Sequence, residues 1–199
     1  MMHYDFIEIG TSDYKTLIQQ ATDDTIGISV EPLKVYLDNL PNPKNVKKIN
    51  CAISADNSEG YVDIYYIPNE LIEKNELVHW MKGCNKVGYY HYQHTQYKDL
   101  VSIEKNILQI PISKLFIENS VDSVDFLTVD TEGSDCYILQ HLLNYLHTKP
   151  SSNYPKKIRF ECNGLTDLKV IDDTIELYIN NGYQLAERTL QDAILIYVK

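Results

Sequence analysis

Acidic side chains mark the places where several apolar runs of this sequence end. A carboxylate at such a position can accept hydrogen bonds from hydroxyl or ammonium groups, bind a cation or take up a proton. The first set surrounds Gly10, with Glu8 before the glycine and Asp13 after it. Glycine lets a ligand approach the backbone closely, and the free N–H groups that follow attract a carboxylate or phosphate. This mixture favours a ligand with an amino acid at one end over a pyrophosphate.

The spacing of apolar side chains predicts the strands and helices that hold these residues. Residues 6–9, FIEI, are typical of a buried strand that stops at the glycine. Thr11, Ser12 and Asp13 are short polar residues that turn a chain and cap a helix, which we expect over residues 14–21. A strand, a glycine turn and the start of a helix together predict a cradle for a nucleotide-like ligand.

A second strand is predicted over residues 25–30, and it ends at Glu31. Glu31 follows Gly10 by 21 positions, a spacing typical of the acid that binds the ribose hydroxyls in dinucleotide-type folds. The alternative is a carboxylate at the start of the helix predicted over residues 33–40, where the helix dipole favours a negative charge. We prefer the ribose interpretation because Glu31 occurs together with the glycine turn.

A third strand, predicted over residues 48–53, ends in a loop that contains Asp56. Ligands of doubly wound sheets lie across the carboxyl ends of the strands, so this loop would flank the base of a nucleotide. Residues 61–67 are predicted to form a strand that lengthens the sheet or pairs at its edge.

The segment 68–100 is the least regular part of the chain, and we expect it to form a lid or substrate loop. Its aromatic and His residues, clustered over residues 89–95, are suited to stack on a sugar and to hydrogen-bond it. The alternative is a flap whose aromatic residues pack on the sheet. His91 and His94 have a spacing that would allow metal binding, but no carboxylate or Cys pattern stands beside them.

A second group of acids follows the strand predicted over residues 124–129. Asp130 and Glu132 come directly after it, and Gly133 permits a turn before a helix. Two carboxylates at one strand end are costly to bring together unless they act on a positive ligand, a metal or a proton. The alternative is that Glu132 caps the following helix and Asp130 only fixes a loop.

The strand predicted over residues 157–161 also ends in an acid, Glu161, and Asn163 follows shortly after it. Together with Asp130, these side chains offer oxygen ligands at strand ends. Such ligands suit Mg²⁺ or Ca²⁺, so a divalent cation is an alternative hypothesis for this end of the sheet.

The 199 residues are predicted to form one doubly wound α/β domain with a mostly parallel sheet, closed by an antiparallel hairpin of residues 183–187 and 193–198. The net charge of −10 disfavours nucleic acid and anionic membrane as partners. Four scattered cysteines without a C-x-x-C pair indicate reduced thiols. The chain opens directly into its first strand and lacks an apolar run of membrane-spanning length, so we expect a cytoplasmic protein with a small or neutral substrate.

The order of these motifs resembles the FkbM-type family of S-adenosylmethionine-dependent methyltransferases over nearly the whole chain. The resemblance rests on residues 6–13, on Glu31-Pro32, on residues 83–85, on the D-x-E-G element within residues 124–133 and on Glu161. It implies a Rossmann-like class I methyltransferase fold whose last strand is antiparallel, and methyl transfer to a hydroxyl oxygen. One departure is that the second glycine often found three or four positions after the first is replaced by Asp13 or Tyr14.

The resemblance also implies where S-adenosyl-L-methionine would bind. The amides that follow the glycine would hold the methionine carboxylate and the neighbouring acids its ammonium group, through Glu8, Gly10, Thr11, Ser12 and Asp13. The ribose and the adenine are expected to contact Glu31, Cys51, Ala52, Ile53 and Asp56.

Methyl transfer to a hydroxyl needs an in-line arrangement and removal of the hydroxyl proton. The candidate general bases are, in order of preference, Asp130, Glu132 and His91. The aromatic and His-rich loop and the acidic surface favour a sugar hydroxyl on a glycan as the acceptor.

Two other functions agree with part of the sequence. A NAD-dependent oxidoreductase would share the first strand, the turn and the ribose acid, but it should carry G-x-G-x-x-G, which this chain lacks. A non-catalytic nucleotide-binding module on the same fold would bind the cofactor weakly or not at all. The acidic residues at the strand ends are all present, so the sequence does not support this alternative.

Overall fold

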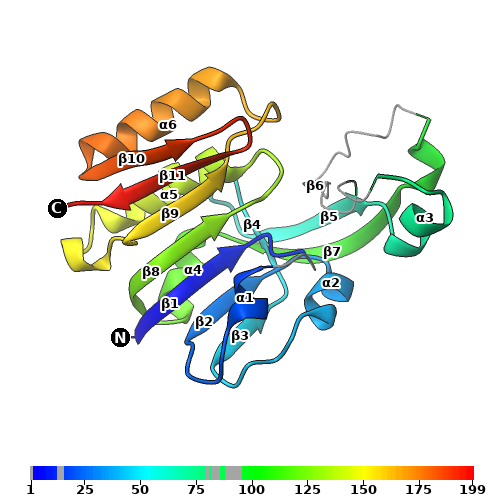
Figure 1. The fold of residues 1–199 in the computed structure, drawn as a ribbon, viewed down its shortest axis with the longest axis horizontal. Helices are drawn as coiled ribbons and strands as arrows, with labels where there is room; N and C mark the ends of the chain where they lie inside the picture. Colours follow the sequence, from blue (N-terminus) through cyan, green and yellow to red (C-terminus); the bar gives the residue numbers. More distant parts are fainter. Residues whose placement is uncertain (1, 13–15, 79–80, 82–85, 88–95) are drawn as a thin grey trace.

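The computed structural model describes residues 2–12, 16–78, 81, 86–87 and 96–199. Within these residues the strands form two sheets (Figure 1). The larger sheet contains, in spatial order, β10 (Tyr183–Arg188), β11 (Asp192–Tyr197), β9 (Lys157–Glu161), β8 (Val121–Val129), β1 (Met2–Ile9), β2 (Gly27–Val30) and β3 (Val46–Ile49). The smaller sheet contains β4 (Ala52–Ile53), β7 (Ser102–Ile110), β5 (Gly60–Tyr66) and β6 (Lys86–Val87).

The helices follow the strands in the order expected for a doubly wound fold. They are α1 (Leu17–Gln20), α2 (Lys34–Asn39), α3 (Asn69–Lys74), α4 (Ile112–Glu118), α5 (Asp135–Leu146) and α6 (Leu168–Asn180), with short 3-10 turns at η3 (Lys98–Leu100) and η4 (Ser151–Asn153). None of the helices that the structure describes is long and apolar enough to cross a membrane.

The larger sheet winds outward from β1 in both directions. β1 pairs in parallel with β2 on one side and with β8 on the other, and β3 and β9 extend the two halves in parallel. The predicted antiparallel last strand is confirmed, because β11 runs antiparallel to both β9 and β10. The last strand lies between these two strands rather than at the edge. The change of winding direction beside β1 is where doubly wound sheets bind ligands.

Both faces of the larger sheet are covered by helices. On one face α4, α5 and α6 pack against the strands and form the main core, to which α5 contributes side chains at helical spacing: Ile138, Leu139, Leu142, Leu143 and Leu146. Burial of each such side chain stabilises the fold by about 1.5–3 kcal/mol. On the other face Ile18, Leu37 and Leu40 pack over Phe6 of β1. The doubly wound α/β prediction is therefore confirmed.

The prediction of one continuous strand over residues 48–53 is wrong, because two short strands in different sheets cover this segment. β3 ends at Ile49, and β4 begins at Ala52 in the other sheet, where it pairs with β7. Asn50 lies at the break, and its side-chain amide donates to the carbonyl oxygens of Glu31 and Pro32 at 2.9 and 2.8 Å. These bonds tie the break to the end of β2, so the chain leaves the larger sheet at this point.

The second sheet was not expected. Residues 61–67 were predicted to lengthen the main sheet or pair at its edge, but β5 pairs antiparallel with β7 and β6 inside the smaller sheet. Figure 1 shows β5 and β7 extending away from the larger sheet toward α3. The predicted lid, 68–100, contains α3 and β6 among its described residues, and its His91 and His94 lie outside the residues that the structure describes.

Candidate functional site

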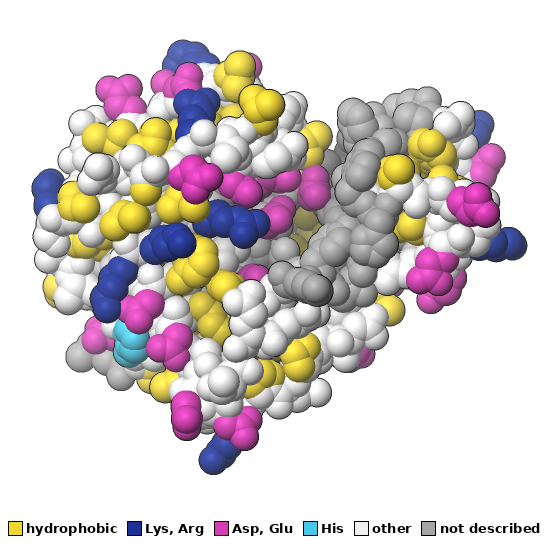
Figure 2. All heavy atoms as spheres, viewed as in Figure 1, with side chains coloured by type: hydrophobic (Ala, Val, Ile, Leu, Met, Phe, Trp, Pro, Cys, Tyr) yellow, Lys and Arg dark blue, Asp and Glu magenta, His cyan; other side chains and the backbone are white. Residues whose placement is uncertain are grey.

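A cavity of about 550 Å³ opens at the carboxyl ends of β1, β2, β8 and β9. Ile64 of β5 and Val87 of β6 also line it, so the smaller sheet forms part of its wall. Figure 2 shows acidic side chains gathered in a hollow of this face, with basic side chains beside them. A cavity of this size suits a small organic ligand or cofactor.

Gly10 sits where two turns of the cavity wall touch. It has a φ of 79°, and a Cβ atom at this position would lie 1.7 Å from the carbonyl oxygen of Asp130. The turn after β1 is also joined to its neighbours by backbone bonds, from the Gly10 amide to Val30 and from the Asp130 amide to Ile9, both at 2.9 Å. Only glycine fits this approach without moving the backbone.

The backbone amides that were predicted to receive a carboxylate are already used within the protein. Those of Gly10 and Thr11 donate to the Val30 carbonyl at 2.9 and 3.3 Å, and that of Ser12 donates to Glu31 Oε2 at 2.8 Å. These three amides are therefore not free to receive a carboxylate, as the predicted cradle requires. The buried polar atoms that have no hydrogen-bond partner among the described residues include the hydroxyls of Thr11 and Ser12, both beside the cavity.

Glu31 braces this turn from the end of β2. It is 2% exposed, and besides holding Ser12 it accepts a hydrogen bond from the Leu33 amide at 2.9 Å through Oε1. The contact with Leu33, the residue before α2, agrees with the alternative interpretation of a carboxylate at a helix start. Ser12 has a φ of 49°, a strained value for a residue other than glycine, and the Glu31 bond stabilises it. Contact of Glu31 with a ribose remains a prediction.

Glu8 brings a second buried carboxylate to the same end of the cavity. Its Oε1 accepts a hydrogen bond from the Leu17 amide at 3.1 Å, whereas Oε2 is buried with no hydrogen-bond partner among the described residues. Burial raises the pKa of Glu8 to about 7, and this effect is opposed by the backbone amides of Leu17 and Ile18, the Thr16 side chain and the charge of Arg159. A buried acceptor of this kind is stabilised by a cationic donor. Asp13, predicted to share this role, lies outside the described residues.

Asp130, Glu132 and Glu161 converge at the other end of the cavity, each with one carboxylate oxygen within 4.8 Å of the others. Desolvation raises the pKa of Asp130 to about 6, opposed by the charge of Arg159. Burial, and then the charge of Glu132, raises the pKa of Glu161 to about 9. Asp130 is therefore mainly ionised at pH 7, while Glu161 holds a proton.

Two further residues at this end of the cavity were not among the site residues predicted from the sequence. Arg159 lines the cavity from β9 and pairs with Asp192 at 3.3 Å. Asp135 is fully buried and holds the turn after β8, since its carboxylate accepts hydrogen bonds from the Thr131 and Gly133 amides at 3.1 and 3.2 Å. The D-x-E-G-x-D spacing is the signal by which Asp135 would have been found.

The third region of the cavity is apolar. Cys51, Ala52 and Ile53 are buried and line it, as predicted for the residues around an adenine. Burial raises the pKa of the Cys51 thiol to about 12, so this side chain is neutral. Asp56 is different: it is exposed, does not line the cavity, and accepts hydrogen bonds from the Ser58 amide and hydroxyl at 3.0 and 2.6 Å. The turn that these bonds close removes Asp56 from the predicted site.

Asn163 is likewise separated from the acids with which it was grouped. Its Oδ1 accepts a hydrogen bond from the Leu165 amide at 2.9 Å, and it does not line the cavity. The group of oxygen ligands that the described residues bring together contains Glu132 in its place. The predicted set of Asp130, Glu161 and Asn163 is corrected accordingly.

No family model matches the chain, and no curated protein does. Among solved structures, the crystal structure of methyltransferase FkbM from Methylobacillus flagellatus KT is similar, with a TM-score of 0.52 and 14% identity. The match covers 99% of this chain and 44% of that protein, so the chain spans less than half of its length. At this identity the likeness concerns the fold. The chain therefore has a methyltransferase-like, Rossmann-type α/β fold.

Proposed function

We propose that this chain is an S-adenosylmethionine-dependent O-methyltransferase that acts on a hydroxyl of a glycan, another sugar or another small molecule. The main support for the proposal is the cavity, whose apolar and acidic regions match the adenine and the ammonium group of S-adenosylmethionine. Apolar Cys51, Ala52 and Ile53 would face the adenine, and the buried Glu8 the ammonium group. The methyltransferase-like fold supports the proposal, because ligands of doubly wound sheets bind at the carboxyl ends of the strands, where this cavity opens.

The methionine end of the donor would be held by side chains rather than by backbone amides. The Thr11 and Ser12 hydroxyls are buried donors without partners among the described residues, and both would bond the carboxylate. Glu8 Oε2 would accept a hydrogen bond from the ammonium group, which removes the cost of a buried, unpaired carboxylate. Glu31 would reach the ribose from the wall of the same cavity.

The chemical step would form the oxygen–methyl bond as the sulfur–methyl bond breaks, with the hydroxyl proton passing to a base. Asp130 is the base that the electrostatics favour, because its pKa of about 6 leaves it ionised near neutral pH. Glu161, with a pKa of about 9, is protonated there and would hydrogen-bond the acceptor instead. Glu132 is the second choice of base, and His91 lies outside the described residues.

Calorimetric titration of the full chain with S-adenosylmethionine, S-adenosylhomocysteine and NAD tests the cofactor. We expect the first two to bind and NAD not to bind, since the Gly10 turn lacks the second and third glycines of a pyrophosphate loop. Binding of NAD alone would overturn the proposal in favour of an oxidoreductase. Binding of none of the three would favour a module that has lost the cofactor.

Incubation with a donor labelled at the methyl group and a panel of glycans and small hydroxyl compounds tests the acceptor. A divalent cation is a further activator to test in this assay, because the oxygens of Asp130, Glu132 and Glu161 converge. If a cation activates the acceptor, EDTA will abolish turnover and Mg²⁺ will restore it. Equal rates with and without EDTA would leave Asp130 as the base acting without a metal.

A further inference from the structure

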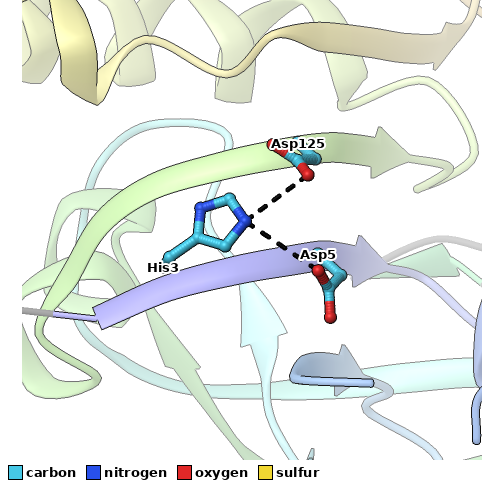
Figure 3. Close-up of side chains that lie close together, drawn as sticks. All are labelled: His3, Asp5 and Asp125. Atoms are coloured by element: carbon cyan, nitrogen blue, oxygen red, sulfur yellow. Dashed lines mark ion pairs between the residues drawn. The ribbon is translucent and has the colours of Figure 1, made fainter. Parts of the chain in front are cut away.

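A second set of metal-ligand side chains lies on the neighbouring strands β1 and β8, and none of its members lines the cavity. His3 and Asp5 belong to β1 and Asp125 to the neighbouring β8. His3 Nε2 lies 3.8 Å from Asp5 Oδ1 and 3.4 Å from Asp125 Oδ2. Figure 3 shows the imidazole ring between the two carboxylates. One ligand atom of each residue lies within 4.8 Å of those of the other two.

Each of the three side chains is also held by a neighbour through the atom that points away from the cluster. These neighbours are the Ser123 hydroxyl at 2.8 Å from His3 Nδ1, the Ile26 amide at 2.8 Å from Asp5 Oδ2, and the Lys156 ammonium at 2.7 Å from Asp125 Oδ1. The atoms that remain, Nε2 and two carboxylate oxygens, face one another. Outer contacts of this kind orient metal ligands in proteins and fix the histidine tautomer.

We propose that His3, Asp5 and Asp125 bind a Zn²⁺ ion. Ligands about 2.0–2.2 Å from one tetrahedral ion lie roughly 3.4 Å apart, close to the two distances at His3 Nε2. One imidazole nitrogen with two carboxylate oxygens suits Zn²⁺, whereas Mg²⁺ and Ca²⁺ prefer oxygen ligands throughout. The side chains of the three residues are 42–47% exposed, which leaves room for a water molecule as the fourth ligand.

The position of this site indicates a structural role. His3 precedes Glu8, the first residue of β1 that lines the cavity, by five residues in an extended strand, which spans roughly 17 Å. None of the three ligands lines the cavity, so an ion there would not belong to the site proposed for methyl transfer. It would instead join the first strand of the chain to β8, whose pairing in the larger sheet is not local in sequence. An ion that binds only the folded chain stabilises it by mass action.

Titration of the full-length, metal-free chain with ZnCl₂, followed by calorimetry and thermal unfolding, tests the inference. We expect one Zn²⁺ to be lost in His3→Gln and in Asp125→Asn. Ser123→Ala, which keeps all three ligands, should bind this ion 10- to 100-fold more weakly. His147→Gln is the matched control, because His147 is exposed, bonds Asn181 and belongs to neither group of possible metal ligands found among the described residues. A hundredfold excess of Zn²⁺ over Kd should raise Tm of the wild type by roughly 5–10 °C, but not that of His3→Gln.

Equal Zn²⁺ affinity of the wild type and His3→Gln would overturn the site, as would the absence of Zn²⁺ binding by the wild type. In either case His3, Asp5 and Asp125 would be an ion-pair cluster only. If His3→Gln fails to fold, Ser123→Ala supplies the same comparison with every ligand in place. Binding of S-adenosylmethionine is measured separately, so failure of the zinc site leaves the proposed methyltransferase untouched, and the reverse also holds.

Discussion

Glu8 has a buried carboxyl group with a raised pKa, because burial destabilises its ionised form. One of its oxygens is held by the Leu17 amide, and the other is buried beside the cavity. An ammonium group at the second oxygen would favour the ionised form and lower the pKa from its value of about 7. If Glu8 binds the ammonium group of the donor as proposed, its charge should affect the affinity for that donor.

Glu8→Gln is expected to weaken S-adenosylmethionine binding roughly 10- to 100-fold, the loss of one hydrogen bond between charged groups. Wild-type affinity should fall as the pH drops below about 7, because protonated Glu8 no longer attracts the ammonium group. Calorimetry from pH 5.5 to 8.5 measures both effects. Glu187→Gln, an exposed change in β10, is the control. Unchanged affinity in Glu8→Gln would remove Glu8 from the site.

Asp130→Asn should lower turnover by about 10²- to 10⁴-fold while S-adenosylmethionine affinity is preserved, since the variant loses the base and keeps its shape. The kcat/KM of the wild type should rise with pH through about 6 as Asp130 loses its proton. Rates from pH 5 to 8 and calorimetry test this, with Asp24→Asn in an exposed loop as the control. Undiminished turnover would assign the base to Glu132 or to a residue outside the described ones.

At the scale of elements, the site depends on two turns that touch. The turn after β1 is braced by Glu31, and the turn after β8 is held by Asp135 through two backbone amides. Each turn contains a residue other than glycine with positive φ, Ser12 at 49° and Glu132 at 55°. The buried carboxylates of Glu31 and Asp135 hold these two turns in their strained backbone conformations.

Gly10→Ala should destabilise the fold by about 1–3 kcal/mol or more and abolish cofactor binding, because its Cβ would overlap the Asp130 carbonyl. Gly164→Ala is the matched control, since a Cβ atom there meets nothing within 4 Å. Urea unfolding of both variants measures the difference. Equal free energies of unfolding would show that the two turns move apart readily.

At the scale of the whole molecule, the chain brings several acids together and raises their pKa values. Burial raises those of Glu8 and Asp135 to about 7 and that of Glu161 to about 9. The folded state therefore holds protons that the unfolded state, with acid pKa values near 4, has already released. The stability of the protein without ligand should therefore depend on pH.

The free energy of unfolding should fall as the pH rises from about 4 to about 9, because over this range the folded state binds more protons than the unfolded state. Thermal unfolding at pH 5.5 and 8.5 measures the change. The variant Glu8→Gln together with Glu161→Gln should show a smaller dependence on pH. S-adenosylmethionine should also reduce it, since its positive charge favours the ionised acids. Higher stability at pH 8.5 than at pH 5.5 would contradict the burial of these groups.

Local patterns in the sequence are sufficient for the main sheet and for most of the cavity. Apolar runs that end in glycine or an acid predict parallel strands, and the carboxyl ends of such strands meet at one edge. For this reason Glu8, Glu31, Asp130, Glu132 and Glu161 line a single cavity, as the strand-end pattern suggested. The zinc ligands show no such pattern, because Asp125 meets His3 only through the pairing of β1 with β8.

The types of most elements, the glycine turn and the acids at the strand ends could be predicted from the chain alone, because they follow from neighbours within a few residues. The departure of the chain from the sheet at Asn50 could not be predicted in this way, nor could the turns that Asp56 and Asn163 close away from the cavity. Only the tertiary structure shows that the amides after Gly10 are used internally. The reason is physical: hydrogen-bond partners and pKa values depend on groups that meet only when distant segments pack together.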